Sequence, residues 1–288
     1  MRKILVLGSV VIALALAFVL RNSRHTPTEP ETARQEVQDD VRAATVAFWQ
    51  HYRGAMKARR EGQWEAAVAR FAQALAINPE HEDSLYYLGN AYFEADEYEK
   101  AAESWRRLLE VNPMASRAHV QLAQLRSCPD VEGMFDLWAA RSALERAIAL
   151  NPEESGPLSR LGEVELALEN RVRAAELFAD ARRTNPRAAS ALYLGAYLAV
   201  KNADRATAAT LLSEAQSAVA VSRVADLPAL EGDIRPGDEE NRVGETMSSR
   251  RLFAPLLQRL REQESMDADL EASAVDDYLR GLPKAGGS

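Results

Sequence analysis

The chain has 288 residues, of which 47% are hydrophobic, 7% aromatic and 27% charged, a composition typical of a soluble helical protein. Its formal net charge of −8 argues against a nucleic-acid-binding scaffold, which would carry a basic surface. The single cysteine, Cys128, cannot form an internal disulfide and therefore identifies no redox compartment.

The N-terminal residues have the pattern of an export signal. After the basic start Met1-Arg2-Lys3, residues 4–20 (Ile4 to Leu20) contain no charge. As a helix this run is roughly 25 Å long, at the short end of what spans a bilayer. We predict that residues 1–21 are a signal anchor with a cytoplasmic N-terminus. A cleaved signal peptide is the alternative, because Ala15-Leu16-Ala17 has the small-x-small form of a cleavage site.

Residues 22–40 are polar and include Pro27, Pro30 and several glutamates. We predict a flexible polar tether that leads into a first helix near Val41.

The centre of the chain repeats itself. Asn-Pro pairs close successive units at residues 78–79, 112–113, 151–152 and 185–186, so that the prolines are 34, 39 and 34 residues apart. Leu-Gly recurs in the first half of the units at residues 88–89, 161–162 and 194–195, with Leu122-Ala123 between them. A bulky residue keeps the same rhythm in the second half: Phe71, Trp105, Leu144, Phe178 and Leu212. A fixed period of this size predicts a repeat architecture.

Each repeated position has a physical reason. Leu88 and Tyr92 share one helix face, as do Ala101 and Trp105, so a unit reads as two amphipathic helices joined near residues 95–97. A small residue such as Gly89 lets the paired helices approach closely. The closing proline cannot donate a backbone hydrogen bond and therefore ends the unit. One such pair cannot bury its apolar surface alone, so neighbouring units must stack.

This pattern resembles the tetratricopeptide repeat, a 34-residue helix-turn-helix unit with small residues at the helix crossing and proline at its end. The resemblance implies an all-α, right-handed superhelix of about five helix pairs. We place the array at residues 41–222, with units at about 48–81, 82–115, 116–154, 155–187 and 188–222. The third unit has five extra residues, which must fall in the turn between Leu122 and Ala140.

In proteins of this family the first helices line a concave face that usually takes a peptide or a partner's helix. Helical spacing places the candidate partner-binding residues on that face: Tyr52, Met56, Tyr86, Asn90, Phe93, Arg117, Gln121, Gln124 and Arg160. An asparagine can donate and accept hydrogen bonds at once, which suits an extended backbone. The alternative for Tyr86 and Phe93 is that they only pack against adjacent helices.

No catalytic constellation is visible in the sequence. The four histidines (His25, His51, His81 and His119) are not paired with one another or with Cys128 at metal-ligand spacing. There is no glycine-rich phosphate loop. We therefore expect no enzymatic activity, no metal and no cofactor.

The C-terminal part differs from the repeats. Residues 223–247 read as an acidic loop with prolines and glycines, and residues 248–288 as two amphipathic helices and a tail. These helices could cap the last repeat, dock a partner, or fold back into the groove.

These features together predict a membrane-anchored, non-enzymatic adaptor of the bacterial cell envelope that binds a partner polypeptide in its groove. The array would lie in the periplasm on a single-pass inner-membrane anchor, or be soluble there after cleavage. The alternative function is an accessory subunit or chaperone of an exported enzyme or of an envelope assembly machine, such as cytochrome maturation or secretion, docked through the C-terminal segment. We expect no binding of nucleic acid.

Overall fold

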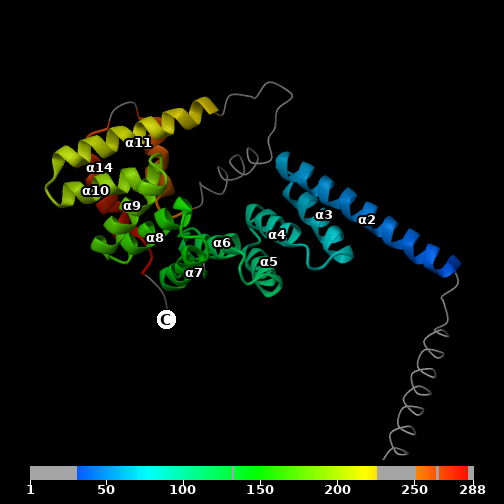
Figure 1. The fold of residues 1–288 in the computed structure, drawn as a ribbon. Coiled ribbons are helices and arrows are strands. Elements are labelled where there is room, and N and C mark those ends of the chain that lie inside the picture. The colour runs from blue at the N-terminus through cyan, green and yellow to red at the C-terminus, as the bar shows by residue number, and fades with distance from the viewer. Residues whose placement is uncertain (1–30, 132, 226–250, 264–265, 285–288) are drawn as a thin grey trace, which may run out of the picture. The chain divides into compact units, whose positions relative to one another are not determined.

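The computed structural model describes residues 31–131, 133–225, 251–263 and 266–284. These residues form helices and no strand. In chain order the helices are α2 (Glu31–Arg60), α3 (Trp64–Ile77), α4 (Glu82–Glu94), α5 (Tyr98–Val111), α6 (Ser116–Ser127), α7 (Leu137–Leu150), α8 (Ser155–Ala167), α9 (Arg171–Thr184), α10 (Ala189–Lys201), α11 (Arg205–Ala225), α13 (Ala254–Glu262) and α14 (Ala268–Gly281) (Figure 1).

The chain divides into two compact units, Met1–Gln50 and His51–Ser288. The described part of the first unit, residues 31–50, is helical and mostly exposed, with Val41 61% and Trp49 44% accessible. The prediction of a flexible tether up to Val41 is therefore wrong for residues 31–40, because α2 already begins at Glu31. The predicted signal segment, residues 1–21, lies outside the described residues.

In the second unit, successive helices pair as the repeats predict: α4 with α5, α6 with α7, α8 with α9 and α10 with α11. A glycine in the first helix sits against the bulky residue of the second. A β-carbon on Gly89 would lie 2.3 Å from Nε1 of Trp105, and one on Gly162 would lie 2.5 Å from Phe178. Because both aromatic side chains are fully buried, neither can move away, and only glycine allows these helix crossings.

The turn between the paired helices also recurs. In four repeats one residue of this turn has the left-handed backbone conformation. These residues are Gly62, Asp96, Glu169 and Ala203, with φ of 69°, 60°, 65° and 60°. Between repeats the chain extends at Asn78, Asn112, Asn151 and Asn185, each before its proline, and this position ends the second helix. The longer third unit has its extra residues between α6 and α7, where Cys128 is fully buried.

Two clusters of buried apolar side chains fill the second unit. One extends from Ala55 in α2 to Val131 and contains Phe71 and Trp105. The other extends from Ala123 in α6 to Val275 in α14 and contains Phe178, Tyr193 and Phe253. The C-terminal helices α13 and α14 therefore share a core with the later repeats.

Candidate functional site

The first helices of neighbouring repeats are joined by polar side chains. Between α4 and α6, Arg117 forms an ion pair with Asp83 (2.6 Å) and places its guanidinium carbon 4.5 Å from the ring centroid of Tyr86. Gln121 Nε2 donates a hydrogen bond to the Tyr86 hydroxyl at 2.9 Å. We call the side of α4, α6, α8 and α10 that carries these residues the first-helix face, and it includes residues 51–60 of α2.

The same pattern continues between α6 and α8, where Arg160 Nη1 donates to Gln124 Oε1 at 2.5 Å. Gln124 is only 2% and Gln121 only 7% exposed. Both glutamines therefore connect neighbouring helices. The sequence predicts Gln121 and Gln124 as partner-binding residues, but the structure buries both side chains at the helix contacts.

Two further candidates belong to the core of the second repeat. Phe93 is fully buried, with its ring centroid 5.5 Å from that of Tyr98 and 6.2 Å from that of Trp105. The expectation that Phe93 contacts a ligand is wrong, and the alternative of helix packing holds for it. Asn90 is 3% exposed, and its Oδ1 accepts a hydrogen bond from Trp105 Nε1 at 3.3 Å. The same indole N–H also donates to the backbone carbonyl of Tyr86 at 3.3 Å, so Asn90 shares this donor.

Five candidates remain partly exposed on the first-helix face: Tyr52, Met56, Tyr86, Arg117 and Arg160. Arg160 lies on α8, whereas the other four lie on α2, α4 and α6 and so come from three successive repeats. Burial, with the nearby Asp83 carboxylate as a second cause, raises the pKa of Tyr52 to about 12 and keeps its hydroxyl protonated. This part of the face offers two phenol rings, a thioether and a guanidinium to a ligand.

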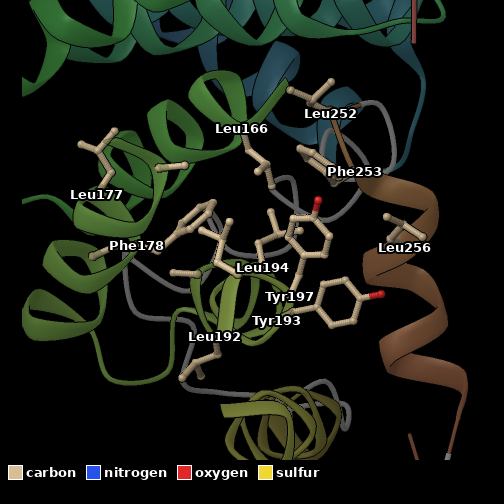
Figure 2. Close-up of a cluster of buried hydrophobic side chains, with 14 of the residues drawn as sticks. Leu166, Leu177, Phe178, Leu192, Tyr193, Leu194, Tyr197, Leu252, Phe253 and Leu256 are labelled. Atoms are coloured by element: carbon tan, nitrogen blue, oxygen red, sulfur yellow. The ribbon is translucent and has the colours of Figure 1, made fainter. Parts of the chain in front are cut away.

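Further along the same face, over α8, the chain meets its own C-terminal segment, which we define as residues 251–263 and 266–284. Arg251 Nη2 pairs with Glu163 Oε1 of α8, and this glutamate side chain is only 3% exposed. Leu252 and Phe253 are buried, and Figure 2 shows Phe253 in the same cluster as Leu166 and the tyrosine side chains of α10. The backbone N–H of Phe253 donates to the Tyr278 hydroxyl at 3.1 Å.

Over α10, the contacts of the C-terminal segment come from α14. The Tyr193 hydroxyl donates to Glu271 Oε2 at 2.7 Å, and Arg259 pairs with the other oxygen of the same carboxylate at 3.1 Å. The Tyr197 hydroxyl donates to Asp276 at 2.9 Å. Burial and the bond to Glu271 raise the pKa of Tyr193, so its proton stays on the oxygen.

The C-terminal segment therefore covers the first-helix face at α8 and α10. From the sequence, capping, docking of a partner and folding back were all open. One signal could have helped: Glu163 follows Leu161-Gly162 as Asn90 follows Leu88-Gly89, so it lies on the first-helix face. If that face is covered, the buried glutamate needs a cationic partner.

The comparisons with known proteins agree with this geometry. Residues 58–125 match the family model of the tetratricopeptide repeat. Residues 58–125 therefore carry tetratricopeptide repeats. A search of the curated proteins returned no match to the sequence.

Solved structures show the same tetratricopeptide fold. One, reported in a functional characterisation of pilF from Pseudomonas aeruginosa, superposes with a TM-score of 0.52 at 18% identity and covers 82% of this chain and 99% of its own. The crystal structure of a MamA protein superposes with a TM-score of 0.50 at 20% identity and covers 64% of this chain and 98% of its own. At these identities the likeness concerns the fold.

Within the described residues, no three His, Cys, Asp or Glu side chains come together in a group that could hold a metal ion. His81 and His119, which the sequence left without a chemical role, are half-buried, and burial lowers the pKa of each.

None of the described helices is both long and apolar enough to cross a bilayer.

Proposed function

We propose that this chain is a non-enzymatic adaptor that binds a partner polypeptide on the first-helix face at residues 51–60 of α2, at α4 and at α6. The observation that carries the proposal is the division of this face. Over α8 and α10 it is covered by the C-terminal segment, whereas Tyr52, Met56, Tyr86 and Arg117 stay partly exposed.

The side chains on the uncovered part suit a polypeptide ligand. Tyrosine offers a large contact area at a small cost in side-chain entropy, and methionine adapts to an irregular apolar surface. Arg117 is held by Asp83 and by the Tyr86 ring, so its orientation is set before a ligand arrives. Tetratricopeptide repeats serve other proteins as interaction scaffolds, and this use agrees with the chemistry of the face.

The C-terminal segment is a weaker candidate for docking a separate enzyme. Its buried residues Leu252, Phe253 and Val275 already pack in the core that it shares with the later repeats. A partner that used these apolar side chains would first have to detach the segment. We therefore assign partner binding to the uncovered face.

We further propose that residues 1–21 anchor the chain in the inner membrane of a bacterial cell and that the repeats lie in the periplasm. The support is the basic start Met1-Arg2-Lys3 and the uncharged run from Ile4 to Leu20. Release of a soluble periplasmic form by cleavage after Ala17 is the alternative. Fractionation of the host cells before and after a carbonate wash distinguishes the two forms.

The binding proposal is tested by affinity capture from the host's envelope, with the full chain as bait beside a Tyr86→Ala/Arg117→Ala variant. The control variant is Arg173→Ala/Glu176→Ala, which removes an exposed ion pair from α9. Circular dichroism verifies that each bait is folded. We expect one protein to be captured by the parent and the control and lost with the first variant. Equal capture by all three would place the binding site elsewhere.

A further inference from the structure

A pocket of about 290 Å³ lies where the C-terminal segment meets the starts of α8 and α10. Its walls include Ser155 and Ser159 from α8, Ser190 from α10, and Leu257 and Leu260 from α13. Two parts of the chain that are distant in sequence thus build it together.

The lining of this pocket is strongly cationic. Arg160, Arg251 and Arg261 all contribute to it, and no described aspartate or glutamate does. Of these three arginines, only Arg251 has a described carboxylate within ion-pair distance, that of Glu163. In a chain whose formal net charge is −8, three guanidinium groups around one small pocket require an explanation.

The hydrogen-bonding capacity of the arginines is only partly used. Arg251 donates to Glu163 through Nη2, while its Nε is buried and has no hydrogen-bond partner in the described part of the chain. A buried donor without an acceptor costs free energy that a bound acceptor would recover. Burial, with Arg251 as the next cause, lowers the pKa of Arg160 to about 10, although the Glu163 and Glu154 carboxylates act in the opposite direction.

Two helix N-termini add to the positive potential. The helices α8 and α10 begin at the pocket, and neither Glu154 nor Ala188 caps its helix with a side-chain hydrogen bond. The partial positive charge at a helix N-terminus favours an anion.

We propose that this pocket binds an oxyanion group, a carboxylate or a phosphate, between Arg160 of α8 and the two arginines of the C-terminal segment. Guanidinium groups match the planar geometry of both anions. Because the ligand contacts α8, α10 and α13 at once, its binding also holds the C-terminal segment on the first-helix face. The site is separate from the partner-binding face at α4 and α6, so either proposal can fail without the other.

The test uses the purified full chain at low ionic strength with two probes, inorganic phosphate and the acetylated dipeptide Glu-Glu. Isothermal titration measures affinity, and the unfolding midpoint is compared with that in sodium chloride of equal ionic strength. We expect at least one probe to bind and to raise the midpoint more than chloride does. A preference for phosphate indicates a phosphate-bearing ligand, and a preference for the dipeptide indicates an acidic peptide.

Two variants locate the site. Arg261→Gln changes an exposed side chain that forms no ion pair among the described residues, so it should leave the fold intact. Arg160→Gln removes a second guanidinium from the lining. Each should weaken binding about tenfold or more, because a hydrogen bond to a charged group is lost. Arg173→Gln on α9 is the control and should bind as the parent does. The proposal is overturned if neither probe exceeds chloride, or if all three variants bind as the parent does.

Discussion

Arg251 and Glu163 form an ion pair between residues 88 positions apart in the chain, and the glutamate side chain is only 3% exposed. This pair joins the first-helix face at α8 to the start of the described C-terminal segment. Removing one member would leave a buried charge without its partner, which is strongly destabilising. The pair therefore ties the position of the C-terminal segment to the fourth repeat.

The attachment of α14 can be tested at Tyr193, which donates a hydrogen bond to Glu271 from a buried position. We expect Tyr193→Phe to lower the free energy of unfolding by about 1–2 kcal/mol, because the buried carboxylate loses a donor. Hydrogen exchange of α14 should become faster, while that of α4 stays unchanged. Tyr92→Phe on α4 is the control and should alter neither quantity. Unchanged exchange in α14 of Tyr193→Phe would show that this bond does not hold the segment.

The pairing of α4 with α5 predicts a large loss of stability when Trp105 is truncated, because its side chain is fully buried against Gly89. We expect Trp105→Ala to lower the free energy of unfolding by about 3–5 kcal/mol, the usual range for truncating a buried large aromatic side chain. Trp138→Ala provides a matched control. Because Trp138 is 54% exposed, this variant should lose little free energy of unfolding. Denaturant titration followed by circular dichroism measures both. A loss below about 1 kcal/mol at Trp105 would mean that the pairing of α4 with α5 is wrong.

The turn between α10 and α11 holds Ala203 in the left-handed region, with a φ of 60°. A β-carbon there is strained by about 1–2 kcal/mol, and the greater freedom of glycine in the unfolded chain offsets part of this. We therefore expect Ala203→Gly to stabilise the protein by about 0.5–1 kcal/mol. Ala199→Gly, inside α10, should instead destabilise it by about 1 kcal/mol. Thermal unfolding distinguishes the two signs, and a lower midpoint for Ala203→Gly would contradict the assigned turn.

The environment of His81 should make the stability of the protein depend on pH. Its Nδ1 accepts a hydrogen bond from the Ser84 backbone at the start of α4, and burial lowers its pKa. Because the folded pKa lies below the unfolded value, the unfolded chain binds the proton more tightly. This contribution to stability is present above about pH 6.5 and is lost as the pH falls through the folded pKa.

The variant His81→Asn keeps an N-cap acceptor that does not titrate. We expect the loss of stability between about pH 7.5 and pH 5.5 to be smaller in this variant than in the parent. His119 titrates equally in both proteins and cancels from the comparison. Equal losses would show that protonation of His81 does not affect the start of α4.

Much of the fold could be predicted from sequence, because the repeat period fixes contacts within each helix pair. The recurrence of Leu-Gly and of a bulky residue places Gly89 against Trp105, and the structure has this contact. The turn at residues 95–97 follows from the same period. The early start of α2 could not be predicted in this way, because residues 31–40 lie outside the periodic pattern.

The site was harder to predict, since helical spacing gives a direction from the helix but does not say what lies there. Helical spacing predicts that Phe93 lies on the partner-binding side of α4, yet its ring packs against Tyr98 and Trp105. Gln124 lies on the first-helix face but is covered by its contact with Arg160. The segment over α10 comes from more than 70 residues further along the chain, as the bond between Tyr193 and Glu271 shows, and no local pattern encodes such a contact.

The most direct test of the account uses a photo-crosslinking amino acid placed at single positions of the full chain in the living host. At Met56 the probe lies on the uncovered first-helix face, at Gly156 it lies in the pocket beside α13, and at Arg173 it lies on exposed α9. The account predicts a crosslink to another protein from Met56, a crosslink within the chain to residues 254–262 from Gly156, and neither from Arg173. A crosslink to another protein from Gly156, with none from Met56, would contradict it.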